Sequence, residues 1–304
     1  RVQRSDELTL FPCMLSKGKD GYTALCLKGA NFMTKARSLY TPLLLVSLLC
    51  ASVQALAQQA ITPKLIMDRA SDVEMGDNAS SRVTMTVLNP KGDERVQELL
   101  SFRKKFGPDN SETRSMMFYV FPLTMRNVGF FSIDYKDTDK TDQHWMYTPT
   151  IQKMRRIGSK RLAFMSSDFS YADISVHNSD DYVYHSMKED VLDGQKVWVI
   201  EGTPTDKEDD EDESYSKSIF YVRQDNYIVI RIINFLKKGN KIKQMDVSDL
   251  SQIDGIWVMG QVAMVTRKDG VELSRTVMKS RDVKFNQPLD ESFFSERQLT
   301  RGPD

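Results

Sequence analysis

The chain has 304 residues and equal numbers of acidic and basic side chains, 42 of each, so its formal net charge is zero. This balance gives no electrostatic reason to expect nucleic acid as a partner. The three cysteines, Cys13, Cys26 and Cys50, all precede residue 51. The rest of the chain therefore has no disulfide framework, zinc-binding cysteine cluster or cysteine nucleophile.

The N-terminal region predicts export. Residues 33–57 begin with Lys35 and Arg37, continue with an apolar run over residues 43–51 and end on small residues at Ala57. This order is typical of a signal peptide, and the apolar run is too short to span a bilayer. We therefore predict a signal peptide over residues 33–57, cleavage after Ala57 and a periplasmic location, with a buried N-terminal helix as the alternative.

The domain organisation follows from this assignment. Residues 1–32 show no sustained helical or strand period and are predicted to be an upstream extension that the functional protein lacks. Residues 58–304 are a suitable length for one domain, particularly a β-rich one.

The mature region begins with a helix signal and continues with strands. Thr62 and Pro63 form a cap and first turn before residues 64–70, which predicts one short helix. After it the apolar period is mostly two, and Gly, Asn and Asp residues such as Asp193-Gly194 separate the runs. The predicted strands are 82–88, 95–106, 115–121, 130–135, 143–147, 152–157, 183–192, 196–202, 217–223, 227–236, 241–250, 257–267 and 271–285.

This series predicts an antiparallel meander, either a barrel or a strongly curved sheet. Between two strands lies the acidic run 206–213, which we interpret as a solvated loop tip; a calcium site is the alternative, although the run lacks the spaced ligands and glycine of a calcium loop. The polar tail, residues 288–304, contains Phe293 and Phe294, which are expected to pack at the edge of the sheet.

No catalytic signature is present. The sequence lacks the glycine-serine-glycine elbow, the zinc-protease helix motif, paired cysteines and phosphate-binding loops. The spacing of His177 and His185 fits no metal site, and His144 stands alone, so we expect ordinary surface or cross-strand histidines. Asp168, Asp173, Asp180 and Asp181 lie in a segment rich in Ser and Tyr, where acids usually act as loop and cap residues. We predict a protein that is not an enzyme and has no metal or cofactor.

The positive signal is an excess of methionine. Of 16 methionines, all but Met14 and Met33 follow Ala57, and many lie on predicted strands among phenylalanines. Methionine is flexible and polarisable, so surfaces rich in it adapt to varied apolar partners. On the concave face of a curved sheet such side chains could line a ligand cavity, or they could fill a closed core.

Several ordered blocks resemble bacterial outer membrane lipoprotein-sorting proteins, a family related to the periplasmic carrier LolA. The resemblance covers residues 60–294 and is carried by the blocks 76–81, 83–88, 101–103, 145–149, 154–157, 164–173 and 254–257. It implies a mainly β, α+β fold: a half-open barrel of eleven antiparallel strands with short helices as a lid over a hydrophobic cavity. It also suggests a membrane exporter of the resistance-nodulation-division (RND) type as a partner.

The leading hypothesis is a soluble periplasmic carrier that binds lipid or lipoprotein acyl chains for transport to or from the outer membrane, with transient contact to membrane surfaces. The lid would come from residues 122–129 and 157–171. The alternative is an accessory or sensor subunit of an RND-type exporter that uses the fold as a protein-interaction platform; a hydrolase is a weaker third. The cavity residues are predicted to be Val83, Met85, Val87, Phe102, Met117, Phe130, Met146 and Met165.

Overall fold

The computed structural model describes residues 61–303 except 138, 160, 176–177 and 206–213. The predicted upstream extension, the signal peptide with its cut after Ala57, the acidic run and His177 lie outside the described residues. Residues 60–304 form one compact unit, to which all the helices and strands named below belong.

Helix α2 (Pro63–Ser71) begins where the sequence predicts it. The Thr62 side chain accepts a hydrogen bond from the Leu65 amide at 3.2 Å, and Pro63 occupies the first turn, where its missing N–H has no cost. Ile66 and Met67 are buried in a cluster with Trp198, Phe220 and other strand residues, so packing against the sheet stabilises this short helix.

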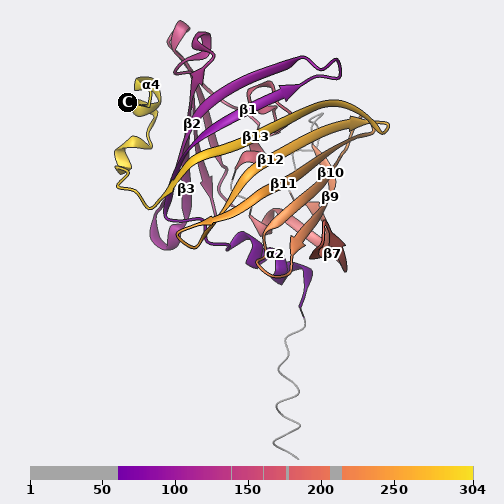
Figure 1. Cartoon of the computed structure of the whole chain (residues 1–304). Coiled ribbons are helices and arrows are strands. Elements are labelled where there is room, and N and C mark those ends of the chain that lie inside the picture. The colour runs from indigo at the N-terminus through magenta and orange to yellow at the C-terminus, as the bar shows by residue number, and fades with distance from the viewer. Residues whose placement is uncertain (1–60, 138, 160, 176–177, 206–213, 304) are drawn as a thin grey trace, which may run out of the picture. The chain divides into compact units, whose positions relative to one another are not determined.

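The strands form a single 13-stranded antiparallel sheet that is not closed, in agreement with the predicted curved sheet (Figure 1). The resemblance implied eleven strands, and the structure has two more. All thirteen predicted strands are present, with ends shifted by a few residues. They are β1 (Asn78–Leu88), β2 (Glu94–Phe106), β3 (Glu112–Phe121), β4 (Gly129–Tyr135), β5 (Gln143–Thr148), β6 (Lys153–Arg156), β7 (Tyr182–Leu192), β8 (Gln195–Pro204), β9 (Tyr215–Arg223), β10 (Val229–Leu236), β11 (Lys241–Ile253), β12 (Ile256–Lys268) and β13 (Val271–Phe285).

The strand order determines the path of the chain between β6 and β7. Every neighbouring pair is consecutive in sequence except β1 and β13, so β6 and β7 are the two edges of the sheet although they follow one another in the chain. Residues 157–181, here called the crossing segment, therefore connect the two edges. The segment contains η4 (Phe164–Ser166), α3 (Tyr171–Ile174) and η5 (Ser179–Asp181).

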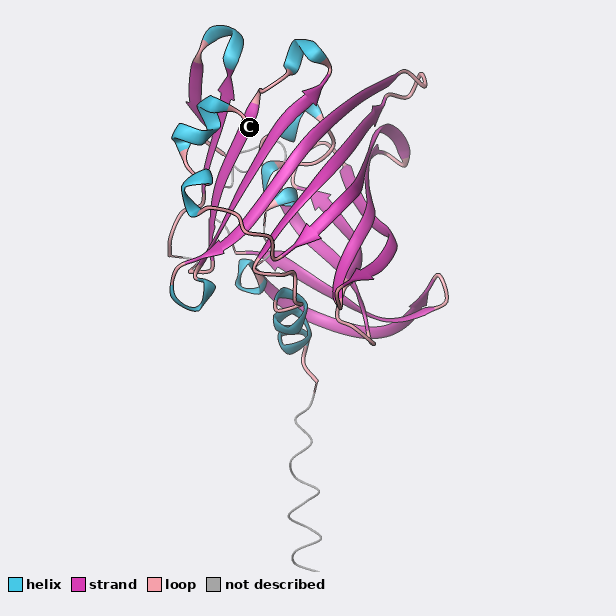
Figure 2. Ribbon diagram, turned by 60° about the vertical axis from the view of Figure 1, so that its left-hand side comes forward, coloured by secondary structure: helices cyan, strands magenta, loops and turns pink. Residues whose placement is uncertain are grey.

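The sheet bends strongly, as Figure 2 shows, and its two faces carry different covers. Side chains from β1 to β5 and β11 to β13 meet in one cluster with the crossing segment. Eight strands can share one cluster only on the concave side of a bent sheet, and we call this side the inner face. The remaining short helices are η1 (Pro108–Asn110), η2 (Leu123–Met125), η3 (Pro149–Ile151), η6 (Glu291–Phe293) and α4 (Glu296–Arg301).

The opposite face, called the outer face, is covered by the C-terminal segment. Phe294 and Leu299 are buried against Met116, Phe118 and Phe131. The sequence placed the tail aromatics at the edge of the sheet, but the structure places them across the outer face of β2 to β5. The absent side chain of Gly129 permits this approach, since a Cβ atom there would lie 2.6 Å from Leu299 Cδ1.

Candidate functional site

The inner face carries a continuous band of apolar side chains dominated by methionine. Register explains the band, because residues opposite each other in an antiparallel pair point to the same face. Met85 of β1 lies opposite Met278 of β13, and Met245 of β11 lies opposite Met264 of β12. Met117 of β3 likewise lies opposite Phe130 of β4, which lies opposite Met146 of β5.

Six of the eight residues predicted to line a cavity belong to this inner cluster. Met85 and Phe130 are buried in it, while the other four are partly buried and pack against it. The four are Val87, Met117, Met146 and Met165.

The other two predicted residues lie outside the inner cluster. Val83 precedes Met85 by two positions, so it faces the same side by alternation, but it is not part of the cluster. Phe102 follows the inner residue Leu99 by three positions and therefore points to the outer face, where its ring centroid lies 4.8 Å from that of Phe293. The prediction that Phe102 lines the inner face is therefore wrong, because alternation along β2 places it on the face opposite to that of Leu99.

The inner cluster is not fully enclosed. Six of its methionines keep part of their surface accessible, whereas Met85 and Met264 are buried completely. A partly accessible apolar band on a concave face is unusual for a filled core, in which side chains of this size are normally sealed from water. The partly accessible methionines are Met117, Met125, Met146, Met165, Met245 and Met278.

The crossing segment covers part of this band. Its residues Phe164, Phe169 and Tyr171 are 1%, 2% and 5% exposed and belong to the inner cluster. The loop between β3 and β4 adds Met125 and Val128. Both segments that the sequence assigned to a lid therefore contact the inner cluster.

A buried carboxylate attaches the crossing segment to the sheet. Asp168, 5% exposed, accepts hydrogen bonds from Thr266 Oγ1 and Thr276 Oγ1, both at 2.6 Å, and from the Ser274 hydroxyl. Its amide also donates to Thr276 Oγ1 at 3.0 Å. The sequence had interpreted Asp168 as a loop residue; only the register of β12 and β13 brings the three hydroxyls together beneath it.

Two further contacts hold the crossing segment. Arg95 at the start of β2 donates through Nη2 to the backbone oxygen of Ser166 at 2.6 Å. In α3, Ser170 and Asp173 form a capping box, as expected of acids in this segment, and the Tyr215 hydroxyl donates to Asp173 at 3.0 Å. Burial raises the pKa of Tyr215 well above its ordinary value, so the hydroxyl remains a donor.

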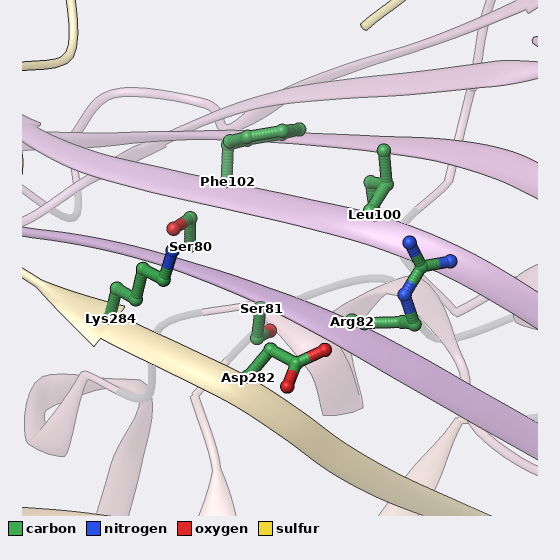
Figure 3. Close-up of a pocket in the computed structure, with 7 residues that line it drawn as sticks. All are labelled: Ser80, Ser81, Arg82, Leu100, Phe102, Asp282 and Lys284. Atoms are coloured by element: carbon green, nitrogen blue, oxygen red, sulfur yellow. The ribbon is translucent and has the colours of Figure 1, made fainter.

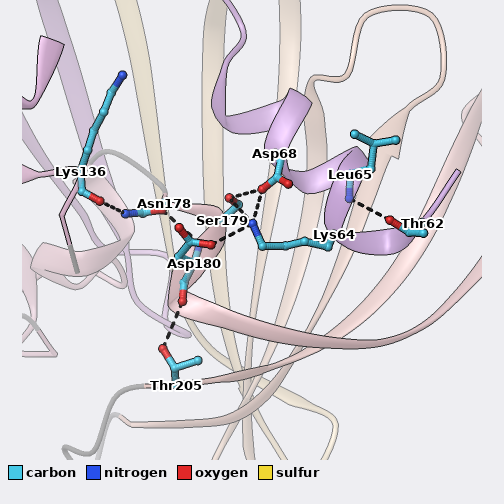
Figure 4. A network of polar contacts seen from close by, with 9 residues as sticks. All are labelled: Thr62, Lys64, Leu65, Asp68, Lys136, Asn178, Ser179, Asp180 and Thr205. Atoms are coloured by element: carbon cyan, nitrogen blue, oxygen red, sulfur yellow. Dashed lines mark hydrogen bonds and ion pairs between the residues drawn. The ribbon is translucent and has the colours of Figure 1, made fainter. Parts of the chain in front are cut away.

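The end of the crossing segment is fixed to α2 by the polar network in Figure 4. Ser179 Oγ donates to Asp68 Oδ1 at 2.6 Å, and Lys64 Nζ lies 2.8 Å from Asp180 Oδ1. Asn178 Nδ2 donates to the backbone oxygen of Lys136 at 2.8 Å. The hydrophobic contacts in the middle of the segment are therefore flanked by polar attachments.

The structure also brings a histidine, an aspartate and a serine together on the inner face. His144 and Asp134 are 3% and 5% exposed, and His144 stacks on Phe130 and Tyr171. However, Asp134 Oδ1 and Ser175 Oγ both lie 3.5 Å from the same ring nitrogen, Nε2. A hydrolytic triad needs the acid and the nucleophile on opposite nitrogens, so this group lacks the geometry for a serine nucleophile.

A small hollow of about 160 Å³ lies on the other side of the sheet, between β1, β2 and β13 (Figure 3). Arg82 lies on the margin of the hollow, where its Nη1 atom is 3.6 Å from Glu98 Oε2. The hollow lies on the opposite face from the inner cluster, and its mixed polar lining does not suit an acyl chain. The lining consists of Ser80, Ser81, Arg82, Leu100, Phe102, Asp282 and Lys284.

Two properties of the described residues bear on other classes of function. Within the described ranges, no group of three or more His, Cys, Asp or Glu side chains is arranged to hold a metal ion. None of the helices in that same part of the chain is long and apolar enough to cross a membrane.

Comparisons with known proteins agree with this architecture. A family model described as "Uncharacterized protein" matches residues 111–301. A solved DUF1329 family protein from Desulfovibrio piger is 26% identical with a TM-score of 0.70, over 78% of this chain and 97% of that one. No curated protein matches the chain.

Two further solved structures show the same fold at lower identity. A domain described as an outer membrane lipoprotein-sorting protein, from Vibrio parahaemolyticus, is 21% identical with a TM-score of 0.69, over 78% of this chain and 98% of that one. A LolA superfamily protein from Nitrosomonas europaea is 17% identical with a TM-score of 0.60, over 79% and 100%.

Proposed function

We propose that the chain is a periplasmic carrier of lipid or lipoprotein acyl chains. It belongs to the family whose model, described as "Uncharacterized protein", matches residues 111–301. Its fold is the LolA-like fold of outer membrane lipoprotein-sorting proteins, and this fold supports the proposal. The cargo would lie on the inner face, beneath the crossing segment, during transport to or from the outer membrane. Contact with membrane surfaces would be transient.

The observation that carries this proposal is the partly accessible methionine band. Its side chains are apolar and adaptable, and they occupy the concave face of a sheet whose cover is held by three buried aromatic rings and a few polar contacts. Each methylene group of a cargo that moves from water into such a site contributes about 0.8 kcal/mol. Unbranched methionine side chains would adjust to acyl chains of different length.

The proposal includes export and excludes catalysis. The predicted signal peptide would deliver the protein to the periplasm, where a carrier shields acyl chains from water. Among the described residues of the inner face, Asp134 and Ser175 both lie at His144 Nε2, and this arrangement, which does not align the serine with a base, supports a binding role. No observation favours the alternative of an exporter subunit, and we do not propose it.

The test is to identify what the protein carries when it is purified under native conditions from a lipid-containing bacterial host. We expect native mass spectrometry to detect a bound lipid, and organic extraction to release it. A fluorescent fatty acid should compete with that lipid for one site. A protein that purifies without lipid and binds no fluorescent fatty acid would contradict the carrier function.

A further inference from the structure

Two hairpin tips carry the most exposed leucine and isoleucine side chains of the described residues. Leu123 in η2, between β3 and β4, is 73% exposed, and Ile151 in η3, between β5 and β6, is 60% exposed. Phe121, the last residue of β3, is 49% exposed. Single apolar side chains on a surface are ordinary, but several together are typical of a surface that a partner covers.

Strand register brings the two tips to the same end of the sheet. Phe118 of β3 lies opposite Gly129 of β4, and Gly129 lies opposite Tyr147 of β5. Residues 119–128 and 148–152 both continue beyond this level. Only β4 separates β3 from β5, so the tips are neighbours, about 10 Å apart at the spacing of strands in a sheet.

The same part of the chain carries charge of one sign only. Residues 113–133 contain two Lys or Arg and residues 143–167 contain five, and neither range contains an Asp or Glu. Four of these cations are exposed, and none of the four forms an ion pair with another described residue. They are Arg126, Lys153, Arg155 and Arg156.

Exposed apolar side chains surrounded by cations suit the surface of an anionic membrane. The apolar side chains enter the boundary between head groups and acyl chains, and the Lys and Arg side chains remain among the lipid phosphates. A dissolved anion would leave the apolar side chains in water. A stable protein interface uses about 20–30 residues on each side, far more than the two short tips offer.

We propose that residues 121–126 and 149–153, with the four cations beside them, form a docking edge that binds the surface of an anionic phospholipid membrane. This inference deepens the proposed carrier function, because it names the part of the chain that meets the membrane. Met125 in the first tip and Met146 on β5 belong to the inner cluster, so an acyl chain that leaves the bilayer at this edge reaches the methionine band directly.

The test is flotation of the intact protein, purified from its bacterial host, with lipid vesicles. One set of vesicles contains phosphatidylcholine alone, and the other contains roughly one third phosphatidylglycerol, which is anionic. We expect the protein to float with the anionic vesicles and to leave them in high salt, where surface charges are screened. It should float little with the neutral vesicles.

Two combined variants separate the apolar from the charged contribution. Leu123→Asp with Ile151→Asp should weaken binding to anionic vesicles at least about tenfold, because a carboxylate does not enter the apolar boundary. Lys153→Gln with Arg155→Gln and Arg156→Gln should weaken it on the order of 100-fold, since each basic side chain near such a surface contributes about fivefold.

The matched control is Val191→Asp. Val191 is 62% exposed in the hairpin of β7 and β8, but it lies beside Asp190 and close to Asp193, so its surroundings are acidic. This variant should bind vesicles as the unaltered protein does. An unaltered protein that ignores anionic vesicles, or one that binds them equally well after the changes at Leu123 and Ile151, would overturn the docking edge.

A titration with a fluorescent fatty acid distinguishes this inference from the carrier function. Both combined variants should keep the fatty-acid affinity and the melting temperature of the unaltered protein, because the altered side chains are exposed. Fatty-acid binding by an unaltered protein that does not bind vesicles would overturn the docking edge alone. Vesicle binding that depends on the two tips, without fatty-acid binding, would contradict the carrier function and support the docking edge.

Discussion

The two faces of the sheet carry similar apolar side chains but are covered in different ways. On the outer face, the C-terminal segment is held by aromatic packing: the Phe293 ring lies 4.8 Å from Phe102, and the Phe294 ring lies 5.6 Å from Phe106. On the inner face, the crossing segment also buries aromatic rings, but it is attached in addition by hydrogen bonds of Asp168 and Arg95 and lies over methionines that remain partly accessible.

Both covers bury aromatic rings, so neither can move unless these rings repack or become exposed to water. The crossing segment is attached in addition by hydrogen bonds to hydroxyl and carbonyl groups, which can be exchanged for bonds to water at a modest net cost. The carrier proposal expects the inner cover to open for cargo, which would then replace the rings of Phe164, Phe169 and Tyr171 on the inner face.

The largest expected effect comes from breaking the outer cover. Phe294 is 1% exposed, so Phe294→Ala should leave a cavity among Met116, Phe118 and Leu299 and lower the free energy of unfolding by about 3–5 kcal/mol. Urea denaturation measures this loss. Phe121→Ala, at a position that is 49% exposed, is the control and should cost less than half as much; equal losses would show that the outer cover is not specially stabilising.

Breaking the attachment of the inner cover should have a smaller and more local effect. Asp168→Ala leaves three hydroxyls without their shared acceptor and should destabilise the crossing segment by about 2 kcal/mol. Hydrogen exchange should then accelerate in residues 161–175 and not in β3 or β4.

The control for this variant is Asp180→Ala, which removes a half-exposed ion pair with Lys64 and should change exchange in residues 161–175 very little. Uniform acceleration across the sheet in Asp168→Ala would mean that the inner cover opens only when the whole unit unfolds.

The accessible methionines sharpen the comparison through binding. Met146→Glu places a charge on the inner face and should weaken fatty-acid binding at least tenfold, because a buried carboxylate disfavours an acyl chain. Met154→Glu on β6, partly buried in the outer cluster, is the matched control and should retain binding. Equal losses in a fluorescent fatty-acid titration would place the cargo elsewhere.

The smallest effect concerns pH at the end of the crossing segment. Partial burial raises the pKa of Asp68, but hydrogen bonds from Lys64 and Ser179 outweigh this effect and hold the pKa below its ordinary value. The stabilisation is present above the unfolded-state pKa of about 3.9 and is lost as the pH falls through the lower folded-state value. Because the side chain is 39% exposed, the contribution should stay below about 1 kcal/mol.

Urea midpoints of the unaltered protein and of Asp68→Asn measure this contribution. The two proteins should differ at pH 7, and the difference should shrink as the pH falls below the unfolded-state pKa of about 3.9. A difference of the same size across this pH range would show that the Asp68 carboxylate does not act through its charge.

The strands were predictable because period-two alternation and turn residues are local signals. The Thr62 cap is also a local signal, and so is the I′-type turn at Asp193-Gly194, in which both residues have positive φ. Five of the six inner residues lie on strands, where alternation determines which side chains share a face, whereas Met165 lies in the crossing segment. Phe102 was misplaced because alternation fixes faces only relative to a known inner residue, such as Leu99.

The attachment points could not be predicted, because they join residues far apart in sequence. Asp168 meets Thr266, Ser274 and Thr276 only after β12 and β13 have paired with the correct register. Arg95 likewise meets Ser166 only because the crossing segment connects the two edge strands across the inner face. Composition showed that many methionines were present, but not which of them remained accessible.

Methionine oxidation by dilute peroxide, with and without a bound fatty acid, tests the central claim most directly. The account predicts that cargo protects the inner methionines Met117, Met146, Met245 and Met278, and leaves the oxidation rate of Met154 on the outer face unchanged. Oxidation rates of the inner methionines that do not change on adding the fatty acid would contradict it.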